Sequence, residues 1–135
     1  MNGYEISTDP ERLDLDYVHA FLSRSYWSPG IARERVARAA AHSLAFGLYA
    51  PGGAQAGYAR AVSDRATFAY LADVFVDPAH RGRGLGVWLV GTVLDHPELE
   101  SLRRWMLLTA DAHGLYARFG FGPSQEGDRL MTRHP

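Results

Sequence analysis

The residues from 70 to 90 (YLADVFVDPAHRGRGLGVWLV) constrain the fold of this chain more than any other stretch. They predict an apolar strand, a turn with proline, a basic glycine loop and the start of an amphipathic helix. In the loop, RGRGLG at positions 81–86, glycine alternates with other residues, so the backbone can turn tightly and approach a ligand closely. A helix that begins there directs unpaired N–H groups and the positive end of its dipole into the loop. With two arginines beside these donors, the stretch predicts a phosphate site.

The 135 residues suffice for one domain with its own core, and we expect a single domain over residues 1–135. Hydrophobic residues make up 47% and charged residues 21% of the chain, proportions typical of soluble globular proteins. The net charge of −1 argues against nucleic acid as a partner, because nonspecific binding to it depends on excess positive charge. The lack of cysteine excludes disulfides, thiolate metal ligands and a cysteine nucleophile within this chain.

The first residues and the apolar runs bear on localisation. Residues 1–8 (MNGYEIST) lack the basic and apolar regions of a signal peptide, and no apolar run approaches the length of a membrane span. No group of side chains has the spacing of a metal site. We therefore expect a cytoplasmic protein without a metal and without a membrane partner.

The remaining residues predict strands and helices on both sides of the glycine loop. Strands are expected at residues 4–7, 43–49, 55–62, 67–76 and 104–109, with a short one at 129–133, and helices at 11–26, 31–42, from 85 to about 96, and 111–119. Pro51-Gly52-Gly53 predicts a hairpin turn, and Gly120 predicts the stop of the last helix. The strand–helix–strand order from 67 to 109 implies one parallel pair, and the hairpins make the rest of the sheet antiparallel. The fold class is therefore mixed α/β.

Two common nucleotide patterns do not fit the glycine loop. The dinucleotide pattern Gly-x-Gly-x-x-Gly, counted from Gly82, requires glycine where Val87 stands. The Walker A pattern requires lysine and then serine or threonine after its last glycine, but Val87 and Trp88 follow Gly86. By itself, the loop leaves phosphate binding and a purely structural turn into a helix as alternatives.

Two motifs together resemble the GNAT superfamily of acetyl-CoA-dependent N-acetyltransferases. The first is VFVDP at positions 74–78 ahead of RGRGLG at 81–86, which is similar to the family's [R/Q]-x-x-G-x-[G/A] motif after a strand ending in V-x-P. The second is LYARFGF at 115–121, similar to the family's segment of Tyr, three residues and Gly-Phe. The resemblance implies the family's fold, a mostly antiparallel sheet with a splayed parallel pair flanked by helices. It also implies acetyl-CoA as acyl donor, although a longer acyl group stays open.

The resemblance further implies how acetyl-CoA is held. The pyrophosphate is expected on the backbone donors of the loop, and the pantetheine arm on main-chain groups of the preceding strand, whose edge must be open. A bulge is expected near Asp73 and Val74, where an N–H would stabilise the developing oxyanion. The residues implied in cofactor binding are Val74, Phe75, Val76, Arg81, Gly82, Arg83, Gly84, Leu85 and Gly86.

Acyl transfer to an amine requires an acid for the departing thiolate and a base for the amine. Tyr116 matches the family's general acid, with packing under strand 104–109 as the alternative. The acidic residue nearest the expected bulge is Asp73, which is shorter than the family's glutamate and would act as base through water. Its alternative role is to bind a backbone or arginine group. Asp111 and His113 are lesser candidates, more simply an N-cap and a surface histidine.

The acceptor is expected to be a primary amine of a small molecule or a peptide. Tyr26, Trp27 and Tyr70, with Asp73, suggest a pocket for a cationic amine in apolar surroundings, although the loop with Tyr26 and Trp27 could merely cover the core. A non-catalytic acyl-CoA sensor is the alternative function. Nucleic-acid binding by the arginine-rich helix 31–42 is a more remote alternative function, which the net charge of the chain disfavours. The oligomeric state stays open, with a homodimer as one alternative.

Overall fold

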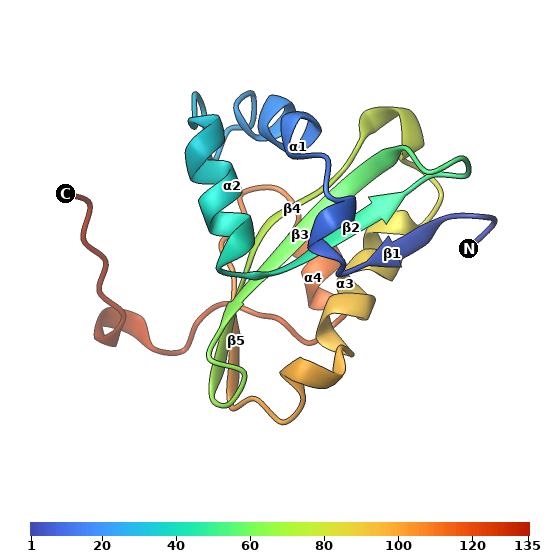
Figure 1. The fold of residues 1–135 in the computed structure, drawn as a ribbon. Coiled ribbons are helices and arrows are strands. Elements are labelled where there is room, and N and C mark those ends of the chain that lie inside the picture. The colour runs from blue at the N-terminus through green and yellow to red at the C-terminus, as the bar shows by residue number, and fades with distance from the viewer.

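Five strands form one sheet in the order in which they occur in the chain, β1-β2-β3-β4-β5 (Figure 1). This computed structural model describes residues 1–135. The strands are β1 (Glu5–Ser7), β2 (Leu44–Tyr49), β3 (Gln55–Ser63), β4 (Phe68–Val76) and β5 (Arg104–Met106). Neighbours from β1 to β4 are antiparallel, and β4 and β5 are parallel. The predicted mixed α/β class with one parallel pair is confirmed.

Four α-helices cover the two faces of the sheet (Figure 1). They are α1 (Leu15–Leu22), α2 (Arg33–Ala41), α3 (Leu85–Leu94) and α4 (His113–Ala117). Helices α1 and α2 pack on one face, and α3 and α4 pack on the other. No helix has both the length and the apolar character needed to cross a membrane. Strand β2 is buried along its whole length, because both faces of the sheet are covered at its position.

The first predicted helix, residues 11–26, is wrong as a single element. Pro10–Arg12 forms a short 3-10 turn, and the carboxylate of Asp9 caps it by accepting from the N–H of Glu11. The backbone then becomes extended at Leu13, and α1 starts anew after Asp14, whose side chain accepts from the N–H of Tyr17. A second capping aspartate four residues before Val18 therefore splits the helical pattern into two elements.

The parallel pair separates soon after it forms. Strand β5 pairs with β4 only from Phe68 to Tyr70, although β4 continues to Val76. On its other side, β4 has an irregular register with β3, since Arg60 pairs with Ala72 while Tyr58 pairs with Phe75. Two residues of β4 thus oppose one of β3, which is a β-bulge. The expected splay and the expected bulge are both present.

The C-terminal segment differs from its prediction. The expected strand at residues 129–133 is absent; Gly127–Arg129 forms a 3-10 turn, and the last residues have no regular structure. Glu126 anchors this segment by ion pairs to Arg104 at 2.6 Å and Arg129 at 3.4 Å. Strand β5 is therefore an edge strand, shorter than the predicted 104–109, and the tail extends away from the sheet (Figure 1).

Candidate active site

The glycine loop between β4 and α3 requires glycine at two positions for its shape. Gly82 and Gly84 have φ angles of 82° and 77°, in the left-handed region that residues with a Cβ rarely adopt. Gly86 differs, because it lies within α3 and a Cβ built there would meet no protein atom within 4 Å. Neither backbone strain nor packing requires glycine at position 86, so the space above it is open to a close ligand.

The main-chain donors of this loop are free. The N–H groups of residues 82–87 donate to no protein acceptor, and the first helical bond of α3 joins the N–H of Trp88 to the carbonyl of Gly84 at 3.1 Å. No side chain caps this helix, and Leu85 is buried in the core. Several unpaired donors and the positive end of a ten-residue helix therefore gather at one place, which is the arrangement that binds phosphate.

Two arginines add positive charge beside these donors. The Nε of Arg81 donates to the main-chain carbonyl of Val76 at 2.9 Å, so this side chain folds back onto the end of β4. Arg83 is exposed. The end of β4 and the glycine loop are thus joined by a direct contact.

The second half of β4 presents an open edge. The N–H of Asp77 donates to the carbonyl of Ala56 on β3 at 2.8 Å, and Phe75 pairs with Tyr58 on the same side. Because main-chain groups alternate in direction along a strand, those of Val74 and Val76 point away from β3, into the splay. The ring of Phe75 instead lies in the core, stacked on Phe21 with 3.8 Å between ring centroids. Of the three residues of β4 that were expected to contact the cofactor, Val74 and Val76 therefore have main-chain groups that point to the open edge, and Phe75 does not.

Asp73 occupies the bulge, with a φ of 56° that few residues other than glycine adopt. One carboxylate oxygen accepts from the Nε of Arg60 at 2.6 Å, and the other accepts from the Nε1 of Trp27 at 2.9 Å. The side chains of Arg60 and Asp73 are only 20% and 9% exposed. Of the two roles considered for Asp73, the structure therefore contains the pairing with an arginine. Each oxygen keeps a second lone pair that a water molecule could use.

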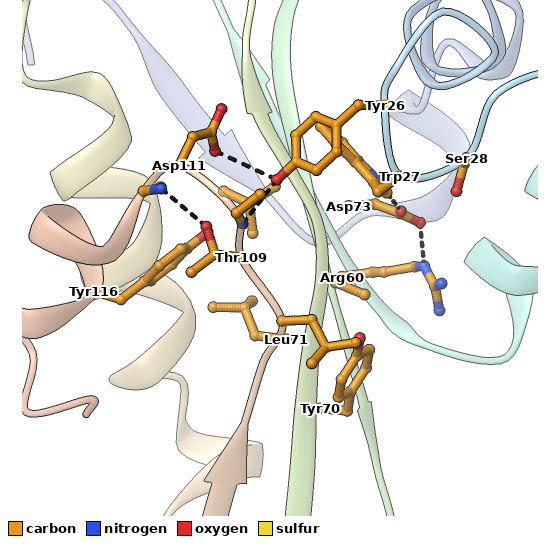
Figure 2. Close-up of a pocket in the computed structure, with 15 residues that line it drawn as sticks. Tyr26, Trp27, Ser28, Arg60, Tyr70, Leu71, Asp73, Thr109, Asp111 and Tyr116 are labelled. Carbon is orange, nitrogen blue, oxygen red and sulfur yellow. Dashed lines mark hydrogen bonds and ion pairs between the residues drawn. The ribbon is translucent and has the colours of Figure 1, made fainter. Parts of the chain in front are cut away.

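A cavity of about 500 Å³ opens beside the bulge (Figure 2). Its walls come from four parts of the chain, namely the connection between α1 and α2, strands β3 and β4, the connection between β5 and α4, and α4 itself. The sequence-predicted residues that line it are Tyr26, Trp27, Tyr70, Asp73, Val74 and Tyr116. The expected pocket residues, the expected acid and one expected main-chain contact are therefore brought together.

Tyr116 reaches the cavity from α4 and is 8% exposed. Burial raises the pKa of its hydroxyl to about 12, with smaller contributions from Tyr26 and Asp111. The hydroxyl is therefore protonated throughout the neutral range and can donate a hydrogen bond or a proton. Its ring also packs against Phe121, so the alternative role, packing in the core, holds alongside a hydroxyl at the cavity.

The connection between β5 and α4 corrects the simpler interpretation of Asp111. The N-cap of α4 is Ala112, and the Oγ1 of Thr109 accepts from the N–H of Ala112 at 3.0 Å. Asp111 is therefore not the N-cap; its carboxylate lines the cavity and accepts a hydrogen bond from the hydroxyl of Tyr26 at 3.4 Å. His113 is exposed and does not line this cavity.

Among the charged residues that line the cavity, Arg60 is the one that the sequence did not predict. It stands in β3 within an otherwise mostly apolar run, QAGYARAV. A charged residue in a buried strand requires a partner, so this position carried a signal that a carboxylate lies nearby. Which carboxylate it meets depends on the register between β3 and β4, which the sequence does not give.

Comparison with known proteins agrees with this geometry. The model of the Acetyltransferase (GNAT) family matches residues 11–121. A protein of Gibberella zeae that is provisionally named an acetyltransferase is 31% identical, over 85% of this chain and 76% of its own length.

Solved structures show the same fold. A provisionally named GNAT acetyltransferase from Xanthomonas campestris pv. campestris has a TM-score of 0.95 and 48% identity, over 100% of this chain and 95% of its own. One from Clostridium acetobutylicum, solved with acetyl-CoA, has a TM-score of 0.69 and 14% identity over 96% and 94% of the two chains, a likeness of fold alone. With the family match over residues 11–121, these findings show that the chain belongs to the GNAT acetyltransferase family.

Proposed function

We propose that this chain is an N-acetyltransferase that transfers an acetyl group from acetyl-CoA to a primary amine of a small molecule or a peptide. The observation that carries the proposal is that Val74, on the open edge of β4, and Tyr116 line the same cavity. The cavity, which an amine can enter, thus contains both a main-chain edge that can hold acetyl-CoA and a hydroxyl, that of Tyr116, that can donate a proton. Family membership supports acetyl transfer as the reaction class.

The residues present fit acetyl-CoA. The free N–H groups of residues 82–87 and the open space above Gly86 suit a pyrophosphate, with Arg81 and Arg83 adding charge. The main-chain groups of Val74 and the N–H of Val76 point away from β3 and suit the amides of the pantetheine arm, which would add to β4 as a further strand, whereas the carbonyl of Val76 already accepts from Arg81. When bound, acetyl-CoA supplies the acetyl thioester, whose carbonyl carbon forms the new C–N bond as the C–S bond breaks.

Two proton transfers are assigned to side chains of the cavity. Tyr116 holds a proton at Oη at neutral pH and donates it to the leaving sulfur. Asp73 accepts the proton of the amine through a water molecule, using the lone pairs that Arg60 and Trp27 leave free. The bulge directs this carboxylate to the cavity.

A non-catalytic acyl-CoA sensor is the second candidate function. The observation that favours it is that both carboxylate oxygens of Asp73 already accept hydrogen bonds, one from Arg60 and one from Trp27, which leaves fewer lone pairs for a water that would take up the proton of the amine. A sensor would keep the glycine loop and the open edge of β4 while turning over no amine.

Changing Tyr116 to Phe separates the two functions. We expect turnover with an amine panel, measured as free thiol released, to fall at least ~100-fold, because general acid catalysis commonly contributes that much. Acetyl-CoA affinity, measured by calorimetry, should stay unchanged. Tyr49→Phe is the matched control, because the hydroxyl of Tyr49 is buried without a partner and lies outside the cavity. Acetyl-CoA binding without thiol release from the unaltered chain, with any amine, would favour the sensor.

A further inference from the structure

The charge of the acceptor cavity comes from three side chains. Arg60, Asp73 and Asp111 are the charged residues among those that line it. Arg60 and Asp73 form an ion pair at 2.6 Å and neutralise each other. The cavity therefore has a net charge of −1, which resides on Asp111, and it has no unpaired positive charge for an anionic substrate group.

The carboxylate of Asp111 is not engaged by the fold. Asp111 does not cap α4, because the N-cap is Ala112 and no side chain bonds to the first turn of this helix. The one hydrogen bond of the Asp111 side chain comes from Tyr26 at 3.4 Å, longer than a usual O–H···O bond of about 2.7 Å. Asp111 is exposed, whereas Tyr116 is buried, so the free charge lies on the solvent side of the cavity and the proposed acid lies deeper.

Aromatic rings complete the surroundings of this carboxylate. Four of them line the cavity, from Tyr26, Trp27, Tyr70 and Tyr116. Ring faces attract cations and are poor surfaces for anions, because their quadrupole is negative above the ring plane. The carboxylate and the rings therefore both favour a positively charged ligand. Tyr26 also accepts from the N–H of Ala110 at 3.1 Å, which fixes its hydroxyl beside Asp111 (Figure 2).

An ammonium group held by a carboxylate keeps its proton, because the neighbouring negative charge stabilises the charged form. A protonated amine has no lone pair with which to attack a thioester. The cation that Asp111 selects therefore has to be a different group from the amine that reacts.

We propose that the acceptor carries a second positive charge besides its reacting amine, and that Asp111 binds this second charge. The substrate class is thus a diamine or another amine with a separate cationic group, and Asp111 is the residue that determines this specificity. The proposal rests on the proposed N-acetyltransferase function. In the bound acceptor, the second cationic group contacts Asp111 and Tyr26 at the solvent side of the cavity, while the reacting amine extends towards Tyr116.

Acceptors that have equal chain length but differ in their second terminal group test this assignment. We would measure kcat/KM for 1,4-diaminobutane, butylamine and 4-aminobutyrate, together with the three- and five-carbon diamines and their monoamines. Diamines should exceed monoamines of equal length by about 5- to 10-fold, the range of a partly exposed charge-assisted contact. The amino acid should be the poorest acceptor, because its carboxylate meets Asp111.

Asp111→Asn removes the charge and keeps the shape of the side chain. In this variant the preference for diamines should fall to less than about 2-fold, since the ion pair is lost while the hydrogen bond to Tyr26 can persist. Acetyl-CoA affinity and thermal unfolding should match the unaltered chain. Asp128→Asn is the matched control, because Asp128 is an exposed aspartate outside the cavity and should leave the preference unchanged.

A binding measurement separates failure of this inference from failure of the proposed function. Calorimetry with 1,4-diaminobutane, on the chain saturated with CoA, does not depend on turnover. Diamine binding that Asp111→Asn weakens, without acetyl transfer, would support the charge site and overturn the enzyme. Acetyl transfer without a diamine preference, or with one that Asp111→Asn leaves intact, would overturn the charge site and leave the enzyme standing.

Discussion

The glycine loop and the acceptor cavity are built in opposite ways. The loop, residues 81–86 with the start of α3, offers main-chain N–H groups from consecutive residues. The cavity presents side chains from four separate parts of the chain, and Tyr26 and Asp111 in it are 85 residues apart in sequence. The geometry of the loop is therefore local, whereas that of the cavity depends on how strands and connections pack.

This difference predicts whether a substitution changes ligand binding alone or the stability of the fold as well. A change at Gly86 should alter binding and leave the fold intact, because neither a positive φ nor an internal contact requires glycine there, in contrast to Gly82 and Gly84. A change in the cavity should alter stability as well, since Asp73 holds together β3, β4 and the connection that carries Trp27. Three experiments test this contrast.

The largest effect is expected from Asp73→Ala. It leaves Arg60, which is only 20% exposed, without its carboxylate, and it places alanine at a φ of 56°. We expect the free energy of unfolding to fall by about 3 kcal/mol, the cost of breaking a largely buried ion pair. Urea denaturation measures this loss.

The double variant Arg60→Met with Asp73→Ala serves as control for that experiment. Removing both charges should recover part of the lost stability, because no unpaired guanidinium then remains in the cavity wall. If Asp73→Ala unfolds at the same urea concentration as the unaltered chain, the cavity does not depend on this ion pair and the contrast with the loop fails.

A smaller effect, on binding alone, is expected from Gly86→Ala. A methyl group in the open space above the loop should raise the KM for acetyl-CoA about tenfold, equivalent to about 1.4 kcal/mol. Stability should stay the same or rise by up to ~1 kcal/mol, because alanine favours a helix over glycine. Steady-state kinetics and thermal unfolding provide the two measurements.

Gly114→Ala provides the comparison for Gly86→Ala. Gly114 lies in α4, has no protein atom near its would-be Cβ and lies away from the glycine loop. Gly114→Ala should neither raise the KM for acetyl-CoA nor lower the free energy of unfolding. A stability loss in Gly86→Ala, or an unaltered KM, would contradict the view that this glycine serves a ligand and not the fold.

The smallest effect concerns alkaline pH. Burial raises the pKa of Tyr116 from 10.0 to about 12, so the folded chain holds this proton more tightly than the unfolded chain. The stability that this provides is complete below pH 10 and is lost as the pH rises through 12. Tyr116→Phe should therefore lose stability less steeply than the unaltered chain between pH 10 and 12, by chemical denaturation.

Gly86→Ala should follow the unaltered chain over the same pH range, since this change removes no titratable group and leaves Tyr116 in place. Equal slopes for Tyr116→Phe and the unaltered chain would show that the hydroxyl of Tyr116 is as solvated in the folded state as in the unfolded one.

The shape of the glycine loop was largely predictable because its signals are contiguous. The alternation of glycine at 82, 84 and 86, after a strand that ends at Val76, is enough to specify a turn into a helix. The motif around Tyr116 added the second half of the family signature. By contrast, helix 11–26 was wrong because Asp14 competes as a cap, and the strand at 129–133 was wrong because nothing pairs with it.

The acceptor side could be predicted only in its residue types. Aspartates and aromatic residues were recognised, but their partners depend on strand register. The register shift between Tyr58 and Arg60 places Arg60 beside Asp73. The ion pair between these two side chains neutralises the charge of the Asp73 carboxylate. No side chain caps α4, so the carboxylate of Asp111 is left with only a long hydrogen bond from Tyr26.

The α/β order, the turn with free N–H groups and the family were thus readable from the amino-acid sequence, because each depends on neighbouring residues. Which carboxylate is paired with an arginine and which one lines the cavity without an ion pair follows only from the packed chain. Both outcomes depend on side chains from distant segments, whose distances are set by sheet register, the bulge at Asp73 and the closure of the α1–α2 connection over the splayed strands.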